Sequence, residues 1–204
     1  MKVLIAYYSR YGHTFQLAQA AEEGVKSAGG IEAVLRKIQE FGEVEKELMK
    51  DPYGKQSLEA QKDIPVCTLD DLREADGLVI GSPTRYGNMT AQVKNFVDST
   101  SQLWLKGSLE GKPAGFFTST ATTHGGQETT LLTMMVPFIH LGMLIVGVPY
   151  STSGMLHTEG RGGTPYGAST ISGTNNDLKP TEDDLNIARA LGKRVAEIAK
   201  KLRS

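Results

Sequence analysis

Segments typical of strands and of helices alternate along most of this chain. Residues 2–8 are continuously apolar and rich in strand formers, and after a polar turn residues 14–28 carry apolar side chains at helical spacing. The same succession recurs, which indicates an α/β fold built on a parallel sheet. The predicted strands are 2–8, 32–38, 77–81, 114–118 and 143–148, and the predicted helices are 14–28, 69–75, 91–103, 127–140 and 181–202. Since 204 residues suit one such unit, we expect a single domain over residues 1–204.

Two long segments interrupt this alternation. Residues 39–65 are rich in Glu, Lys and Asp and poor in apolar residues, so we expect a solvated insertion there. Residues 149–180 are rich in Gly, Ser and Thr, a composition that favours turns over regular elements. Loops of this length in compact domains are usually functional or mobile.

The charge and the cysteine content exclude several classes of protein. Lys plus Arg number 22 and Asp plus Glu number 23, and this formal net charge of −1 gives no general attraction to nucleic acid or anionic lipid. Apolar runs are too short for a membrane span and Lys2 leads directly into a predicted strand, so we expect a cytoplasmic protein. Cys67, the only cysteine, excludes an internal disulfide and a CxxC motif, and a lone cysteine is typically a small buried hydrophobe rather than a nucleophile.

Polar loops follow the first, third and fourth predicted strands. Because ligands of parallel α/β sheets gather beyond the carboxyl ends of the strands, we expect these loops to converge on one crevice. The loops are Ser9-Arg10-Tyr11-Gly12-His13-Thr14, Ser82-Pro83-Thr84-Arg85-Tyr86-Gly87-Asn88-Met89 and Ser119-Thr120-Ala121-Thr122-Thr123-His124-Gly125-Gly126-Gln127.

The first of these loops suits a phosphate. It offers hydroxyls at Ser9 and Thr14, a flexible Gly12 and backbone N–H groups at the start of a helix. It contains neither GxGxxG nor GxxxxGK[ST], so neither a dinucleotide-binding Rossmann turn nor an NTPase phosphate loop is indicated. A helix-capping turn whose Ser and Thr only satisfy helix amides explains the same residues, and this loop alone does not decide between the two.

The other two loops suit a flat, polar ring. The second joins an aromatic, a guanidinium and an amide beside Pro83 and Gly87, and the third supplies many small donors, although a polar surface turn has the same composition. Strands 2–8 and 77–81 do not end in carboxylates, which excludes the divalent-metal site of a response regulator, and we expect no metal.

Four motifs together resemble the WrbA family of NAD(P)H:quinone oxidoreductases. They are S-R-Y-G-H-T at 9–14, G-S-P-T-R-Y-G-N-M at 81–89, H-G-G-Q-E at 124–128 and R-G-G-T-P-Y-G-A at 161–168. They occur in the family's order, and the likeness runs from Lys2 to about Leu202. The resemblance implies a flavodoxin-like fold with strand order 2-1-3-4-5 and helices on both faces, noncovalent FMN, NADH or NADPH as the electron donor, quinones as substrates, and a homotetramer.

The resemblance also implies roles for single residues. The first loop would hold the FMN phosphate, Thr84, Arg85 and Tyr86 would line the isoalloxazine, and the third loop would meet its other edge. The predicted cofactor-binding residues are Ser9, Arg10, Tyr11, Gly12, His13, Thr14, Pro83, Thr84, Arg85, Tyr86, Gly87, Asn88, Ser119, Thr120, Ala121, Thr122, Thr123, His124, Gly125 and His140. His140 is also the predicted catalytic residue, and Tyr11 and Trp104 are the predicted substrate-binding residues. Simple packing explains His140 at the end of an apolar helix and Trp104 equally well from the residues alone.

The implied reaction is hydride transfer from a nicotinamide to flavin N5, followed by reduction of a quinone at the same site in a ping-pong sequence. The main alternative is a flavodoxin-type electron-transfer protein, but such carriers are strongly acidic around the flavin, whereas this chain is near neutral and has Arg10 and Arg85 in the expected flavin loops. We expect a partner subunit to order residues 149–180 and to complete the active site, with a lid on the same subunit as the alternative.

Overall fold

The computed structural model describes residues 1–156, 158–159 and 161–203. Its strands are β1 (Lys2–Tyr7), β2 (Glu32–Lys37), β3 (Gly77–Pro83), β4 (Pro113–Thr120), β5 (Leu144–Val146) and β6 (Ala168–Ile171). Its helices are α1 (His13–Ser27), α2 (Gly42–Leu48), α3 (Pro52–Ala60), α4 (Leu69–Glu74), α5 (Ala91–Asp98), α6 (Ser101–Leu105), α7 (Gln127–His140) and α8 (Glu182–Arg203). None of the helices in the described residues combines the length and the apolar character needed to cross a membrane.

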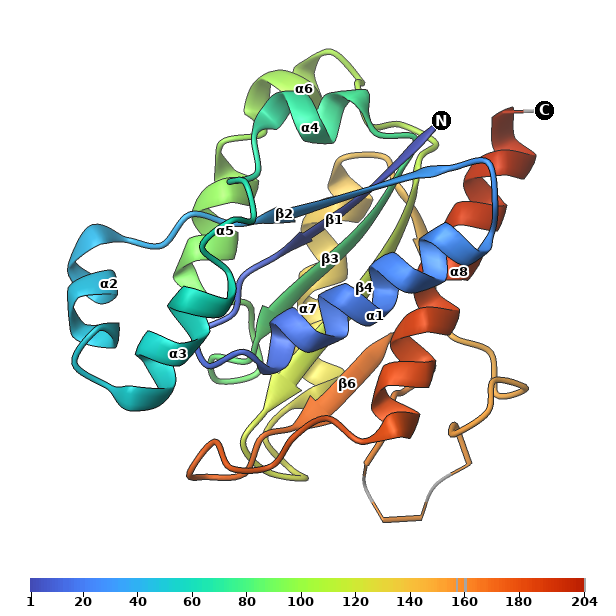
Figure 1. Cartoon of the computed structure of the whole chain (residues 1–204). Coiled ribbons are helices and arrows are strands. Elements are labelled where there is room, and N and C mark those ends of the chain that lie inside the picture. The colour runs from blue at the N-terminus through green and yellow to red at the C-terminus, as the bar shows by residue number, and fades with distance from the viewer. Residues whose placement is uncertain (157, 160, 204) are drawn as a thin grey trace.

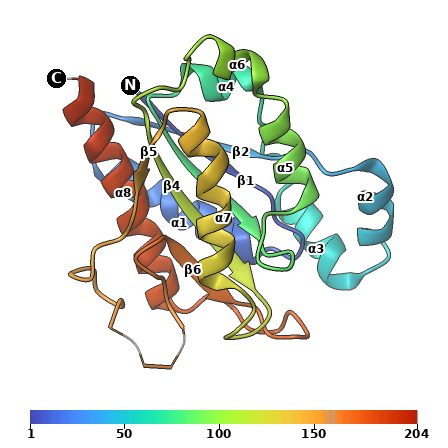
Figure 2. The same cartoon turned by 180° about the vertical axis from the view of Figure 1, so that it is seen from behind.

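The strands form one parallel sheet in the order β2-β1-β3-β4-β5, so the fold predicted from the sequence is confirmed. Helices α1 and α8 cover one face, and α4, α5 and α7 lie on the other (Figures 1 and 2). Each face buries its own apolar cluster, because the strands of a parallel sheet are covered on both sides and are therefore apolar at nearly every position. The buried strand β1 shows this directly, since Val3 to Tyr7 have no exposed surface.

Two glycines allow α1 and α8 to pack backbone against backbone. A Cβ on Gly24 would lie 1.9 Å from the carbonyl oxygen of Arg189, and a Cβ on Gly192 would lie 2.1 Å from that of Ala21. Both distances are far below van der Waals contact, so only glycine fits at either position. The crossing holds α1, whose first turn follows the first polar loop, firmly on the sheet.

The edge of the sheet beside β4 is made in two parts. The first residues of β4, Pro113–Gly115, pair with β5, and the last, Phe117–Thr120, pair with β6. Between the two parts the chain makes a long excursion and returns, since the Val148 backbone N–H donates to the Pro165 carbonyl at 3.0 Å. The prediction that residues 149–180 contain no regular element is therefore wrong, because β6 completes the edge strand by pairing with a distant segment.

The predicted helix 91–103 is also wrong as a single element. It is divided into α5 and α6 where Ser99 and Thr100 turn their hydroxyls back onto the carbonyls of Phe96 and Val97, at 2.6 and 2.7 Å. Such side-chain bonds compete with the backbone ladder of a helix. The predicted strand 143–148 is shorter than expected, since only Leu144–Val146 pair with β4.

The insertion at 39–65 is exposed over much of its surface, as predicted, but it folds into the helices α2 and α3. Asp51 caps α3 by accepting from the backbone N–H groups of Tyr53 and Gly54, and Pro52 occupies the first helical position. Gly54 lets α3 approach the backbone of Leu48 at the end of α2, and Leu48 is buried there. The two helices therefore form a small packed hairpin at the side of the sheet (Figure 1).

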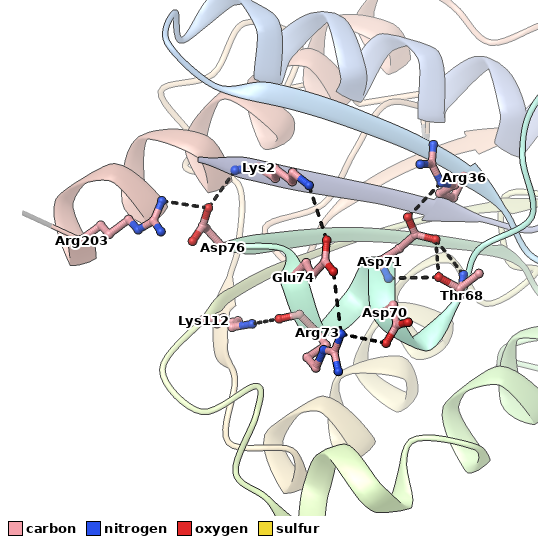
Figure 3. Close-up of polar contacts among 10 residues, drawn as sticks. All are labelled: Lys2, Arg36, Thr68, Asp70, Asp71, Arg73, Glu74, Asp76, Lys112 and Arg203. Carbon is pink, nitrogen blue, oxygen red and sulfur yellow. Dashed lines mark hydrogen bonds and ion pairs between the residues drawn. The ribbon is translucent and has the colours of Figure 1, made fainter.

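Charged residues join α4 to the strands β1 and β2. Figure 3 shows Arg36 of β2 paired with Asp71 of α4 at 3.0 Å, while Lys2 pairs with Glu74. Burial opposes the ionisation of Asp71, but hydrogen bonds from Thr68 and the charge of Arg36 outweigh it, so the pKa of Asp71 lies below its ordinary value. This network is structural, because it fastens α4 along β1 and β2, from Lys2 at the start of β1 to Arg36 near the end of β2.

Candidate functional site

The first polar loop runs from Ser9 to Gly12 between β1 and α1. Gly12 precedes the helix with a φ of 91°, a left-handed conformation that favours glycine, and its N–H donates to the Ser9 hydroxyl at 3.1 Å. The guanidinium of Arg10 lies over the ring of Tyr11, 5.4 Å from its centroid. His13 and Thr14, the first residues of α1, are buried. The positive end of the helix dipole therefore faces this loop.

Thr14 links the first loop to the third. Its hydroxyl is 2.9 Å from that of Ser119 near the end of β4, and both residues are buried. The second loop joins them, since the Thr84 N–H donates to the Ser119 carbonyl at 2.9 Å. The three loops converge as the sequence predicts, because β1, β3 and β4 are neighbours that end at the same edge.

The second loop contains a tight turn. The backbones of Arg85 and Asn88 are bonded in both directions, at 2.7 and 3.0 Å, and Tyr86 and Gly87 between them have positive φ values of 54° and 76°. Positive φ at both central residues defines a type I′ turn, which is strained at a tyrosine. Thr133 of α7 holds the turn by donating to the Gly87 carbonyl at 2.9 Å. The ring of Tyr86 is consequently presented to solvent, fully exposed.

The loops surround a cavity of about 100 Å³. It is lined by Ser9, Arg10, Tyr11, His13, Thr14, Pro83, Thr84, Arg85, Ser119, Thr120, Ala121, Ser172 and Asn176. Hydroxyl groups and two guanidiniums dominate this lining, and no carboxylate side chain is among the described residues that form it. A hydroxyl and guanidinium set of this kind at the start of a helix suits a phosphate dianion.

Two of these lining residues were not predicted. Ser172 directly follows β6 and accepts the backbone N–H of Leu178 on its carbonyl, and Asn176 stands in the turn between them with a φ of 58°. His13 reaches the same turn through the backbone of Leu178; burial lowers the pKa of its imidazole, and this contact opposes the shift. The signal available in the sequence was the S-G-T-N-N-D run of turn residues, but only the unpredicted strand β6 brings it to the cavity.

Other predicted residues lie elsewhere. Gly12, Tyr86 and Gly87 belong to the loops but do not line the cavity, and residues 122–124 are exposed beyond the end of β4 with Gly125 half-buried behind them. His140 and Trp104 are brought together, but in a second cavity, a groove of about 550 Å³ between α5, α6 and α7. Asn88 lines that groove as well. Because Arg85 lines the first cavity, the Arg85–Asn88 turn stands between the two.

Neither a metal site nor a reactive cysteine is supported by the described residues at the edge of the sheet where the polar loops lie. Within the described part of the chain, no three His, Cys, Asp or Glu side chains lie close enough to hold a metal ion. Cys67 is buried away from the loops, and burial raises the pKa of its thiol to about 12, which keeps it protonated and unreactive.

Comparison with known proteins gives a consistent result. Residues 1–158 match the family described as NADPH-dependent FMN reductase. A protein of Solidesulfovibrio magneticus named NAD(P)H dehydrogenase (quinone) is 46% identical, with all of both chains covered, and one of Geobacter sulfurreducens with the same name is 48% identical over 99% of each. Among solved structures, a WrbA-like flavodoxin from Agrobacterium tumefaciens superposes with a TM-score of 0.67 at 23% identity, covering 98% of each chain. Flavodoxin 1 from Bacillus cereus gives 0.60 at 15% identity, over 97% of this chain and 98% of that one, a likeness of fold alone.

Proposed function

The chain belongs to the NADPH-dependent FMN reductase family, and from that premise we propose that it is an FMN-dependent NAD(P)H:quinone oxidoreductase, which reduces quinones to hydroquinones with two electrons. The observation that carries this proposal is the cavity at the ends of β1, β3 and β4, where hydroxyls, guanidiniums and a helix N-terminus meet without a carboxylate. That donor set fits the FMN phosphate, and it does not fit a metal or a cationic ligand.

Within this proposal the loops bind and orient the cofactor. Ser9, Thr14 and the N–H groups at the start of α1 hold the phosphate, while the Thr84–Asn88 turn carries the isoalloxazine toward the groove that contains His140 and Trp104. Bound FMN would supply the redox chemistry, the transfer of two electrons from a nicotinamide to a quinone. His140 would donate a hydrogen bond in the groove that it lines with Trp104, and Trp104 there and Tyr11 in the first cavity would give the flat substrates aromatic surfaces.

Anaerobic stopped-flow spectroscopy of the FMN-loaded protein tests the activity. Mixing with NADH or NADPH should bleach the oxidised flavin absorbance in a single fast phase, and a following addition of benzoquinone should restore it. Steady-state rates at several quinone concentrations should give parallel double-reciprocal lines, as a ping-pong sequence requires. Absence of bleaching with both nicotinamides, together with reduction by a protein reductase, would instead establish the electron-carrier alternative.

We further propose that the enzyme is a homotetramer whose active sites are completed by neighbouring subunits. Supporting this, apolar side chains stand exposed around the His140 groove, with Trp104 at 59%, Leu105 at 69%, Val136 at 52% and Ile139 at 58% exposed. An exposed apolar area of this kind on a soluble domain typically marks an association surface. The excursion at 149–164 contributes the exposed side chains of Tyr150 and Leu156.

Light scattering of the loaded protein, with activity measured on the same fractions, tests the assembly. A mass of four chains of 22.0 kDa is expected. Ile139→Lys should split the assembly and remove quinone reductase activity together, whereas Glu43→Lys, an exposed change on α2, should do neither. A fully active 22.0 kDa monomer would support a lid on the same subunit instead.

We also propose that the enzyme works in the cytoplasm, since a single buried thiol suits a reducing compartment.

A further inference from the structure

Helix α3 of the insertion lies directly against the first polar loop. Its Ser57 hydroxyl would be 3.9 Å from a Cβ on Gly12, so this side chain faces the glycine of the loop. Directly after this helix, the Gln61 amide nitrogen lies 3.5 Å from the Ser9 carbonyl oxygen, a long contact that its N–H shares with a shorter bond to Ser57. The insertion, to which the sequence assigns no chemical role, therefore approaches both ends of the first polar loop, at Ser9 and at Gly12.

The buried face of α3 is polar, which is unusual for a packed surface helix. Ser57 is 4% exposed, and Gln61, which directly follows the helix as its C-cap, is 5% exposed; the other buried residue of the helix is Gly54. Burying hydroxyl and amide groups is unfavourable unless each is hydrogen-bonded, and apolar side chains would serve if packing were the only requirement. Here the Gln61 amide donates to the Ser57 hydroxyl at 2.7 Å and to the Ser57 carbonyl at 2.8 Å.

The pair is also anchored to the sheet. Lys37 at the end of β2 donates from Nζ to the Gln61 carbonyl at 2.8 Å, and its backbone is bonded to the segment that follows the insertion, at Pro65 and Cys67. The backbone of Gln61 is thus tied to β2, and its side-chain amide is held by Ser57.

Orientation of the Ser9 carbonyl has a consequence for the loop. In a trans peptide the carbonyl oxygen and the following N–H point in opposite directions. Holding the Ser9 oxygen toward α3 therefore aims the Arg10 N–H away from α3, the orientation in which a backbone donor is available to an anion in the loop. We propose that Ser57 and Gln61 are positioning residues of the phosphate site, which hold the Ser9–Gly12 backbone in the form that binds the FMN phosphate. This inference rests on the proposed function, because it assumes that the first loop holds that phosphate.

The test compares FMN with riboflavin, which has the same ring and lacks the phosphate. Apo-protein is titrated with each flavin, and binding is followed by quenching of flavin fluorescence. Gln61→Met keeps the length of the side chain and removes its donor, so the dissociation constant for FMN should rise about 3- to 10-fold, as loss of one net hydrogen bond implies. The constant for riboflavin should stay unchanged. Gln56→Met is the matched control, since it is the same substitution at an exposed position of the same helix, and it should change neither constant.

Ser57→Ala provides a second, smaller change, and it decides the matter if Gln61→Met does not fold. It removes the hydroxyl that accepts from the Gln61 amide, and it should weaken FMN binding selectively as well. An unchanged FMN constant in both variants would overturn the inference, and so would an equal loss of FMN and riboflavin affinity, which would indicate general loosening. Thr14→Val distinguishes a failure of the phosphate assignment from a failure of the role of α3. If Thr14→Val leaves FMN binding intact, the phosphate assignment itself fails, whereas if it weakens FMN binding and the α3 variants do not, only the role of α3 fails.

Discussion

Adding one methyl group to either glycine of the α1–α8 crossing should force the two helices apart. Cβ atoms on Gly24 and Gly192 would stand 1.9 and 2.1 Å from carbonyl oxygens, where ordinary contact begins near 3.4 Å. The obstacle in each case is backbone, which cannot rotate aside, so the helices must separate by roughly 1.5 Å in a close-packed interior. Overpacking of this kind costs about 1–3 kcal/mol or more, and the better helix propensity of alanine returns about 1 kcal/mol.

We therefore expect Gly24→Ala and Gly192→Ala each to lower the free energy of unfolding by about 2 kcal/mol. Because one separation of the helices relieves both clashes, the double variant should cost little more than either single one, which gives a coupling energy of about 1–2 kcal/mol. Urea denaturation of the apo-protein, followed by circular dichroism, measures all three.

Gly42→Ala is the matched control for this cycle. Gly42 is also helical, at the start of α2, but nothing lies within 4 Å of where its Cβ would be, so alanine should be neutral or slightly stabilising. Strictly additive costs in the double variant would refute the shared displacement. Single variants that behave like the Gly42 control would refute the clash itself.

Three further outcomes are expected. The Tyr7 hydroxyl is fully buried and has no hydrogen-bond partner among the described residues, so Tyr7→Phe should leave the free energy of unfolding unchanged or raise it by up to about 1–3 kcal/mol; a loss above about 1 kcal/mol in urea would contradict this. The pKa of Asp71 is lowered in the folded state, so its contribution to stability is complete above the ordinary value of 3.8 and is lost as the pH falls through the folded value. Arg36→Met should raise that folded pKa, so the difference in unfolding free energy between the variant and the unsubstituted protein should shrink as the pH drops below 3.8. A difference that is constant from pH 6 to about pH 3 would argue against the pair. Cys67 should resist iodoacetamide at pH 8 in the native protein and react on unfolding in urea, and rapid native labelling would show that the thiol is not buried as described.

Local signals were enough to predict most of the fold. Continuous apolar runs such as β1 predict buried strands of a parallel sheet, and apolar side chains at helical spacing over 14–28 predict α1, because each signal is contained within a short stretch of chain. The edge strand β6 was missed because its residues, A-S-T-I, become a strand only by pairing with Phe117–Thr120. Sequence patterns of short range do not contain that partner.

The same distinction holds for the site. The three loops were predicted because each follows a recognisable strand, and the geometry places Thr14 beside Ser119 as parallel topology requires. Ser172 and Asn176 were missed because they reach the cavity through β6. Ser57 and Gln61 were missed because a polar residue on a charged helix is ordinarily solvated, and only the tertiary contacts of α3 with the first loop and β2 bury them. The division of the predicted residues between a cavity and the His140 groove is likewise a property of the tertiary structure.

The hydrogen bond between Val148 and Pro165 closes the loop at its neck and separates the length of the loop from the pairing of the sheet. Chain that leaves the sheet at one hydrogen-bonded point and returns to the same point imposes no length on what lies between, and each doubling of such a loop costs only about 0.6 kcal/mol in closure entropy. The sequence of the stretch is less free than its length, because Met155 is buried in the core and the Gly162 N–H donates to Asp184 at 2.7 Å. The hydrogen-bonded neck thus lets the loop change in length while β5 and β6 keep their register with β4, provided that these two attachments are kept.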